Sequence, residues 1–247
     1  MSVPSTSNKL AANAVHPLVC WLSQLWLIPR RLILKNRVRR LVIERAGSRD
    51  FVVLPNVFNP VIFRTGRFLA DFIDAAPLGQ IAGNSGQPVA LDMGTGCGIH
   101  AIFAADRGFT VEAIDINPEA TRCARINAML NRVESQVSVH DGDLFAPVTG
   151  QDFDLVMCSL PKFRGTPDTS FEVGWRSPDV IDRFASGLPK ALKPDGVALV
   201  LLTSHGDEQG MLDGLDAAGL CIDIAQRKHF GVEIMTIYRV THPQNGL

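Results

Sequence analysis

The residues best suited to chemistry form a glycine-rich turn at positions 91–98, with the sequence Leu91-Asp-Met-Gly-Thr-Gly-Cys-Gly. This turn follows a short apolar run, residues 89–91, and precedes a run with helical spacing, residues 99–107. Glycines have no Cβ, so the backbone of such a turn can bend sharply and lie against a ligand. Doubly wound α/β folds bind nucleotides at turns of this kind, at the carboxyl ends of parallel strands. The segment therefore predicts a nucleotide-type site.

The spacing of the glycines separates two kinds of ligand. A dinucleotide-binding turn has the pattern G-x-G-x-x-G, whereas Gly94, Gly96 and Gly98 give G-x-G-x-G, with Ile99 at the position of the last glycine. Asp92 precedes the first glycine. Its carboxylate would repel a pyrophosphate and would suit a cationic amino group. These residues favour a ligand with an amino group over a dinucleotide.

Two further carboxylates follow later strands. Asp115 comes directly after the predicted strand 110–114, 17 residues after Gly98, where a carboxylate can accept both hydroxyls of a ribose. Asn117 then precedes the predicted helix 118–131. Asp143 lies in Asp141-Gly-Asp-Leu-Phe, directly after the predicted strand 137–140. These three turns all stand at carboxyl ends of predicted strands, so we expect them to share one site.

Taken in register, the three segments resemble motif I and the later acidic motifs of class I S-adenosylmethionine-dependent methyltransferases. The resemblance implies S-adenosylmethionine as cofactor, with Asp92 near its amino-acid end. It also places Asp143 at the adenine amino group and Leu144 against the adenine ring. The predicted cofactor-binding residues are Thr65, Asp92, Gly94, Thr95, Gly96, Gly98, Asp115, Asn117, Asp143, Leu144 and Ser159.

A narrower resemblance points to the acceptor site. The segments 57–60, 64–66 and 171–196 are similar to those of the small-domain methyltransferases, a group that includes release-factor glutamine and ribosomal-RNA guanine enzymes. The similarity covers roughly residues 41–240. Where these enzymes carry Asn-Pro-Pro-Tyr, this chain has Ser159-Leu-Pro-Lys. We predict that Ser159, Pro161 and Lys162 form the acceptor site. The cation of Lys162, in place of a stacking ring, favours an anionic acceptor over a planar base.

A hydroxyl or ammonium acceptor would also need a general base. By position, the candidates are His100, His229, Glu233 and Tyr238. Methyl transfer from an activated sulfonium otherwise depends on proximity and alignment.

The elements that must hold these residues alternate between strand and helix from residue 88 onward. The predicted strands are 89–91, 110–114, 137–140, 153–158, 197–202, 221–226 and 233–240, and the predicted helices between them are 99–107, 118–131, 178–192 and 209–218. This order predicts an α/β, Rossmann-like methyltransferase fold. Its sheet has seven strands, is mostly parallel and has an antiparallel last strand. The fold also includes a helix at 68–76 and a β-hairpin at 41–54.

The N-terminal part differs in character. Residues 1–60 are interpreted as a helical segment plus the hairpin on the substrate side, and residues 61–247 as the cofactor-binding domain. We expect a helix at 18–27. The segment 30–40 contains six basic residues and no acid. It is interpreted as a solvated helix face, with phosphate binding as the alternative.

The whole chain sets further limits. With 247 residues, 46% apolar residues and a formal net charge of −1, it is a globular protein without general attraction to nucleic acid. Its five cysteines are an odd number without metal-ligand spacing, so we expect no metal site. The apolar run 14–28 is interrupted by His16 and Pro17 and is too short to span a membrane, so we expect a cytoplasmic protein without a membrane partner.

These observations predict a methyltransferase that modifies N or O of a small-molecule acceptor. The first alternative is a protein (glutamine-type) or RNA N-methyltransferase. The second is a non-catalytic cofactor-binding module, and a nicotinamide enzyme comes last.

Overall fold

The computed structural model describes residues 40–77, 86–161, 163–168, 172–231 and 233–243. Within these residues, a seven-stranded sheet has the order β5-β4-β3-β6-β7-β9-β8. The strands are β3 (Val89–Met93), β4 (Thr110–Asp115), β5 (Val137–Asp141), β6 (Phe153–Cys158), β7 (Leu192–Thr203), β8 (Cys221–Phe230) and β9 (Glu233–Thr241). The first five strands of this order are parallel, and β9 runs antiparallel to both of its neighbours. The predicted Rossmann-like methyltransferase fold is confirmed.

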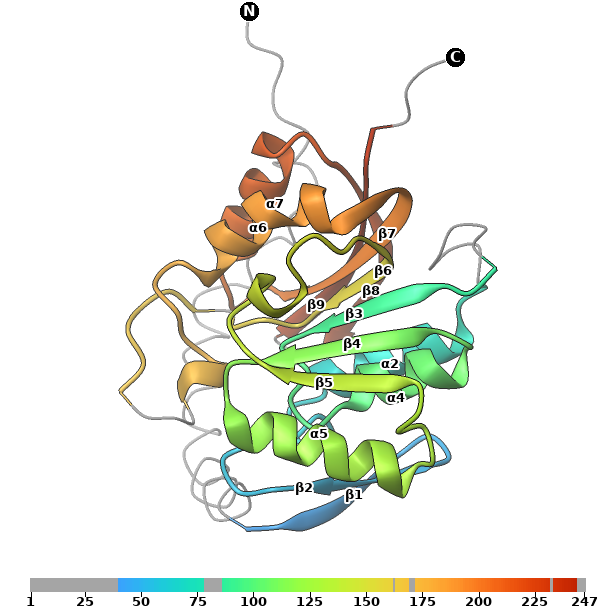
Figure 1. Cartoon of the computed structure of the whole chain (residues 1–247). Helices are drawn as coiled ribbons and strands as arrows, with labels where there is room; N and C mark the ends of the chain where they lie inside the picture. The colour runs from blue at the N-terminus through green and yellow to red at the C-terminus, as the bar shows by residue number, and fades with distance from the viewer. Residues whose placement is uncertain (1–39, 78–85, 162, 169–171, 232, 244–247) are drawn as a thin grey trace, which may run out of the picture.

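Helices cover both faces of the sheet. In Figure 1, α2 (Thr65–Ala75), α4 (Ile99–Asp106) and α5 (Pro118–Leu130) lie on one side, and α6 (Val180–Ala191) and α7 (Glu208–Ala217) lie on the other. Successive side chains of a strand point to opposite faces. On β7, for example, Leu199 belongs to the apolar core under α2 and α4, whereas Ala198 and Val200 belong to the core under α6 and α7. Both faces are therefore apolar, as a covered parallel sheet requires.

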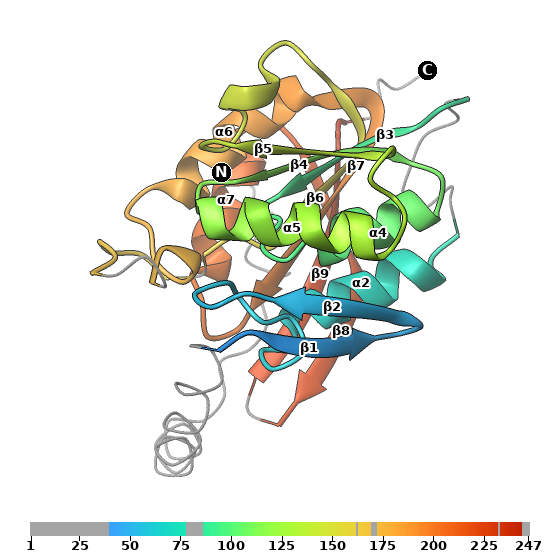
Figure 2. The ribbon, with the colours of Figure 1, turned by 60° about the horizontal axis from the view of Figure 1, so that its bottom comes forward.

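The hairpin of β1 (Val42–Ala46) and β2 (Arg49–Val53) lies beside α5 (Figure 2). Its apolar side chains, including Phe51 and Val53, belong to the same core as α2 and α4. Arg49 reaches the far end of α4, where its guanidinium pairs with both carboxylate oxygens of Asp106. The hairpin thus packs against α4 and α5, and the division of the chain at residue 60 stays a prediction.

Some predicted boundaries and positions differ from the structure. β7 begins at Leu192, not at residue 197, because residues between Leu192 and Val197 bulge out opposite Phe153 and Leu155 of β6. The antiparallel strand β9 lies one position inside the sheet, and β8 forms the edge. The predicted helix 18–27 and the basic segment 30–39 lie outside the described residues.

None of the helices in the described part of the chain combines the length and apolar character that a membrane crossing would need.

Candidate active site

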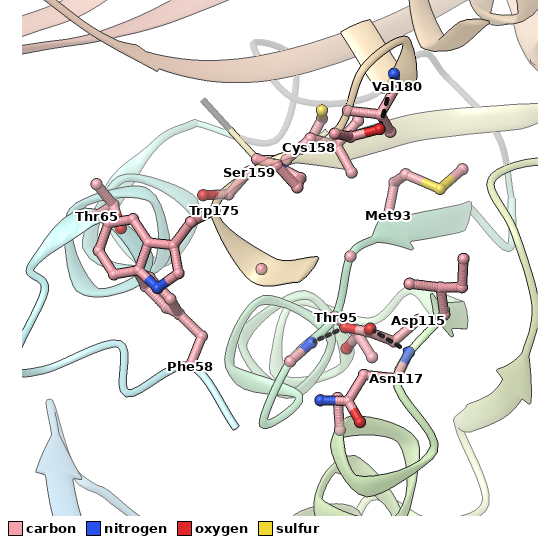
Figure 3. Close-up of a pocket in the computed structure, with 18 of the residues that line it drawn as sticks. Phe58, Thr65, Met93, Thr95, Asp115, Asn117, Cys158, Ser159, Trp175 and Val180 are labelled. Carbon is pink, nitrogen blue, oxygen red and sulfur yellow. Dashed lines mark hydrogen bonds between the residues drawn. The ribbon is translucent and has the colours of Figure 1, made fainter. Parts of the chain in front are cut away.

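A cavity of about 330 Å³ opens at the carboxyl ends of β3, β4, β6 and β7. Its size lies within the range of small-molecule sites, about 300–1,000 Å³. The predicted site residues that line it are Thr65, Gly94, Thr95, Gly96, Asp115, Asn117, Asp143, Leu144, Ser159 and Pro161. Figure 3 shows two ends: Thr95, Asp115 and Asn117 lie together, and Phe58, Thr65 and Trp175 lie apart from them, with Ser159 between. The topology therefore brings most of the predicted residues into one site.

The glycine-rich turn is held against the neighbouring strand. The N–H groups of Gly94 and Thr95 both donate to the carbonyl of Ile114, at 2.9 Å. Gly96 and Gly98 have φ of 56° and 83°, a left-handed backbone that costs little only for glycine. A Cβ added at Gly98 would approach Ala124 Cα to 3.1 Å, whereas one at Gly96 would meet nothing within 4 Å. The turn thus packs tightly on α5 at Gly98 and faces open space at Gly96.

Asp115 lies at the end of β4 on the cavity wall. One oxygen of its carboxylate accepts the N–H of Gly96 at 2.9 Å, and the other accepts the N–H of Asn117 at 2.9 Å. Burial raises the pKa of Asp115 to about 6, although the N–H groups of Asn117 and Gly96 favour its ionised form. Each oxygen has acceptor capacity left for a further donor.

Asp92 lies behind the glycine turn, and its predicted role near the amino-acid end of the cofactor stays a prediction. It is completely buried and is not among the residues that line the cavity. Its Oδ2 accepts the Thr95 hydroxyl at 2.6 Å and the N–H of Ala101, in the first turn of α4, at 3.1 Å. A helix N-terminus favours a carboxylate because its N–H groups are unpaired and its dipole is positive there. In this structure Asp92 holds the turn and the helix behind the site.

The end of the cavity beside β5 combines polar and apolar groups. Leu144 is buried with a left-handed backbone, and Asp143 is exposed and pairs with Arg183 at 2.6 Å. Ile116 also lines the cavity and is 56% exposed, a large fraction for an apolar side chain. Ile116 was not among the predicted site residues, although its position directly after Asp115 was a usable signal.

Asn117 and Thr65 begin helices at the rim. The Asn117 side chain caps α5 by accepting the N–H of Glu119 at 3.1 Å, and its amide donates to the carbonyl of Asn56 at 3.2 Å. Thr65 is the buried first residue of α2. Both residues therefore join the cavity wall to the loop that follows the hairpin.

The predicted acceptor segment directly adjoins the glycine turn. Met93 and Cys158 are paired across β3 and β6, so Gly94 and Ser159 follow side by side. A Cβ at Gly94 would lie 3.2 Å from Leu160 Cδ2 and 4.0 Å from the carbonyl oxygen of Ser159. Lys162 lies outside the described residues, so its predicted role stays a prediction.

Aromatic rings from distant segments complete this end of the cavity. Phe58 and Trp175 line it, with ring centroids 5.1 Å apart. Phe63 packs on both, at 4.5 Å from Phe58 and 4.8 Å edge-to-face from Trp175. These rings were not among the predicted site residues, because nothing in their spacing along the chain connects residue 58 to residue 175.

Of the four candidates for a general base, His100 alone lines the cavity. It is buried, with Nε2 3.1 Å from the carbonyl oxygen of Gly66 and Nδ1 3.4 Å from Asp92 Oδ1. Tyr238 is buried elsewhere and donates its hydroxyl to Glu208 at 2.9 Å. These contacts show that His100 packs between α2 and α4.

Two cysteines that line the cavity, Cys97 and Cys158, are unreactive. Burial raises the pKa of the Cys97 and Cys158 thiols well above the usual value, so both stay neutral at physiological pH. A neutral, buried thiol is a poor nucleophile. Among the described residues, no group of three His, Cys, Asp or Glu side chains could hold a metal ion.

The fold and the comparisons define the class of enzyme: the protein is an S-adenosylmethionine-dependent methyltransferase. The family model described as "Methyltransferase small domain" matches residues 51–232, most of the chain. The chain therefore belongs to the methyltransferase small domain family.

The chain is also similar to individual methyltransferases. A candidate protein N5-glutamine methyltransferase of Methanocaldococcus jannaschii is 32% identical over 146 residues, which are 56% of this chain and 73% of that protein. The ribosomal protein uL3 glutamine methyltransferase of Bradyrhizobium diazoefficiens is 35% identical over 120 residues, or 43% of this chain and 38% of that enzyme. This chain thus matches less than half of the second relative's length.

A solved structure supports the fold. The ribosomal protein L11 methylase of Lactobacillus delbrueckii subsp. bulgaricus aligns with a TM-score of 0.53 and 20% identity. The alignment covers 77% of this chain and 84% of that one.

Proposed function

We propose that this enzyme methylates the side-chain amide nitrogen of a glutamine-type residue in a protein. The observation that carries this proposal is the aromatic wall of Phe58 and Trp175 at the cavity end beside Ser159. Such a wall suits a flat group, and a primary amide is flat. The names of the two relatives, both glutamine methyltransferases, support the same acceptor.

The residues around the glycine turn fit S-adenosylmethionine. The open space beside Gly96 admits the ligand against the backbone, and the free acceptor capacity of Asp115 suits two ribose hydroxyls. Ile116 and Leu144 would cover the adenine ring, and the exposed apolar side chain of Ile116 on the cavity wall supports this role. The bound cofactor supplies a methyl group on a cationic sulfur, already activated for transfer.

The acceptor segment positions the amide. The Ser159 hydroxyl and the backbone carbonyls of Ser159 and Leu160 are hydrogen-bond acceptors for its two N–H groups. These acceptors would hold the amide nitrogen toward the methyl group that the bound cofactor would supply. The N–C bond would form as the S–C bond breaks, and one N–H proton would pass to water. The short distance of 3.2 Å between Leu160 Cδ2 and a Cβ built on Gly94 supports this proposal, because the reaction needs donor and acceptor ends in close proximity.

The small-molecule interpretation has weaker support. It was based on the cation at Lys162 and on the missing ring, yet Phe58 and Trp175 supply rings from other segments. Around the cavity, the described lining residues include four carboxylates (Asp115, Asp143, Asp207 and Glu208) against two guanidiniums (Arg176 and Arg183). This charge balance does not favour an anionic acceptor.

Radiolabelling tests the proposal. Purified enzyme is incubated with methyl-tritiated S-adenosylmethionine and ribosomal proteins prepared from cells that lack the gene. Acid hydrolysis of a methylated glutamine amide releases tritiated methylamine, which is volatile, whereas methylated lysine or arginine stays with the amino acids. Label recovered as methylamine is expected. Label in an organic small molecule, with none in protein, would favour the small-molecule acceptor instead.

Replacing the acceptor hydroxyl gives a second test. In Ser159→Ala, we expect unchanged affinity for S-adenosylhomocysteine by calorimetry and a turnover about tenfold lower, since one hydrogen bond of about 1–1.5 kcal/mol is lost. Equal turnover in the variant would place the acceptor elsewhere in the cavity.

A further inference from the structure

Trp175 belongs to a segment that comprises the described residues 163–168 and 172–177, which we call the strap, and its two ends are joined. The N–H of Phe163 donates to the carbonyl of Trp175 at 3.0 Å, and the N–H of Ser177 donates to the carbonyl of Phe163 at 3.1 Å. The guanidinium of Arg176 lies over the Phe163 ring, 5.9 Å from its centroid. These contacts close the base of the strap and leave Trp175 facing the cavity (Figure 3).

Arg164 ties this base to two helices. Its Nη1 and Nη2 donate to the two carboxylate oxygens of Asp182, in the first turn of α6, at 2.6 and 2.8 Å. Its Nε pairs with the carboxylate of Asp207, the residue that caps α7. The planar guanidinium fixes direction as well as distance when it binds a carboxylate in this two-pronged way. Arg164 thus sets the strap against the ends of both helices beside the acceptor site.

We propose that Trp175 stacks on the acceptor amide and that Arg164 is the positioning residue that holds Trp175 in place. The inference rests on the proposed function for the nature of the acceptor. Trp175 then supplies from the strap the ring that is missing after Pro161. Its indole is backed by Phe63 and flanked by Phe58, so it presents a rigid wall.

The Arg164 pairs are well exposed, with 40% of the Arg164 side chain and 57% of the Asp182 side chain accessible. Exposed ion pairs contribute little to stability. Arg164→Lys keeps the positive charge but loses the two-pronged pairing of the guanidinium with Asp182. We therefore expect the variant to fold normally but to hold the strap less firmly. Arg49→Lys is the matched control, because Arg49 makes a similar two-pronged pair with Asp106 away from the cavity.

Fluorine NMR tests the positioning. The chain has three tryptophans, so protein labelled with 5-fluorotryptophan gives three resonances, and Trp175→Phe identifies the one from Trp175. In Arg164→Lys, we expect this resonance to shift and its H2O-to-D2O isotope shift to increase, as the ring becomes exposed. Arg49→Lys should leave it unchanged. An unchanged Trp175 resonance in Arg164→Lys would refute the positioning role.

Kinetics test the stacking. The probe is N-acetylglutamine methylamide as methyl acceptor, with N-acetylnorleucine methylamide as the inert analogue. Trp175→Ala should raise the acceptor KM about two- to tenfold with a similar kcat, in keeping with the strength of ring contacts. Trp175→Phe should have an acceptor KM close to that of the unmodified enzyme. The affinity for the cofactor should be the same in both variants as in the unmodified enzyme.

The outcomes separate the inference from the proposed function. If the unmodified enzyme methylates glutamine and the KM of Trp175→Ala is unchanged, the stacking role is wrong and the function stands. If no glutamine compound or protein is methylated, the proposed function and the stacking role both fail. The NMR result still decides the role of Arg164 in that case.

Discussion

At the scale of single residues, two aspartates near strand ends have different surroundings. Asp92 is sealed behind the glycine turn and stabilises it through Thr95 and Ala101. Asp115 faces the cavity, and burial raises its pKa to about 6. The first carboxylate therefore stabilises the turn, and the second lies on the cavity wall, where we propose that it binds the cofactor.

The raised pKa predicts how cofactor affinity depends on pH. Asp115 is ionised above pH 6 and protonated below it, and a protonated carboxyl accepts hydroxyl donors less well. We expect affinity for S-adenosylhomocysteine to be constant above pH 7 and to fall by up to about tenfold per unit below pH 6. Calorimetry from pH 5 to pH 8 measures this dependence.

Asp115→Asn is the control for this titration. It should bind about ten- to a hundredfold more weakly at pH 7.5, because an amide replaces a doubly hydrogen-bonded carboxylate. Its affinity should show no step near pH 6. A step of the same size in this variant would assign the titration to another group.

Two glycines of the same turn should respond differently to alanine. Either change forces a left-handed backbone on a residue with a Cβ, which costs about 1–2 kcal/mol. At Gly98 the new Cβ would also press on Ala124, so we expect a loss of unfolding free energy of about 2–4 kcal/mol. At Gly96 the Cβ would enter open space instead, so the larger effect should be on cofactor binding. Urea unfolding measures the loss of stability in both variants, and calorimetry measures their cofactor affinity. An equal loss of affinity in the two variants would contradict the view that Gly96, and not Gly98, faces the cofactor.

At the scale of elements, Asn127 of α5 joins the hairpin to the glycine turn. Its side chain accepts the N–H of Val52 at 2.8 Å and donates to the carbonyls of Val52 at 2.7 Å and Cys97 at 2.8 Å. The residue is completely buried, so no water can replace these bonds without rearrangement. The hairpin and the cofactor site are therefore connected through one amide.

Removing this amide should weaken both regions. We expect Asn127→Ala to lower the free energy of unfolding by about 2–4 kcal/mol, because buried N–H and C=O groups lose their partners. Affinity for S-adenosylhomocysteine should fall as well, since the Cys97 carbonyl belongs to the turn. Arg122→Ala, at an exposed position on the same helix, should change neither quantity. A stable Asn127→Ala protein would mean that the hairpin is held mainly by its apolar contacts.

At the scale of the whole molecule, charge argues against a nucleic-acid acceptor. The formal net charge is −1, and the described cavity wall carries more carboxylates than guanidiniums. The basic segment 30–40, which lies almost wholly outside the described residues, is the one opposing observation.

Salt dependence separates these possibilities. We expect weak binding to bulk RNA in gel-shift assays even at low salt, because the net charge of −1 gives no general attraction to phosphates. A protein that contacts several phosphates would instead bind tightly at low salt and lose affinity steeply as salt rises. The comparison is made at low and moderate salt with the unmodified protein and with Arg37, Arg39 and Arg40 all changed to Ala. Tight, salt-sensitive binding that disappears in the triple variant would promote RNA to the leading acceptor.

The sequence alone predicted the fold, and it grouped residues that line one end of the cavity. Alternation of strands and helices has short-range signals, and the glycine turn, Asp115 and Asp143 each lie within a few residues of the end of a predicted strand. Parallel strands then bring these carboxyl ends to one edge of the sheet, so order along the chain was enough to group them.

Only the tertiary structure decided which side chains face the cavity and what closes its other end. Asp92 and Thr95 are close in sequence, yet one lies behind the turn and the other lines the site. Phe58 and Trp175 meet across more than a hundred residues because the loop after the hairpin and the strap both pack at the carboxyl edge. Local sequence patterns carry no information about such long-range packing, since it depends on how loops of irregular backbone settle on a finished sheet.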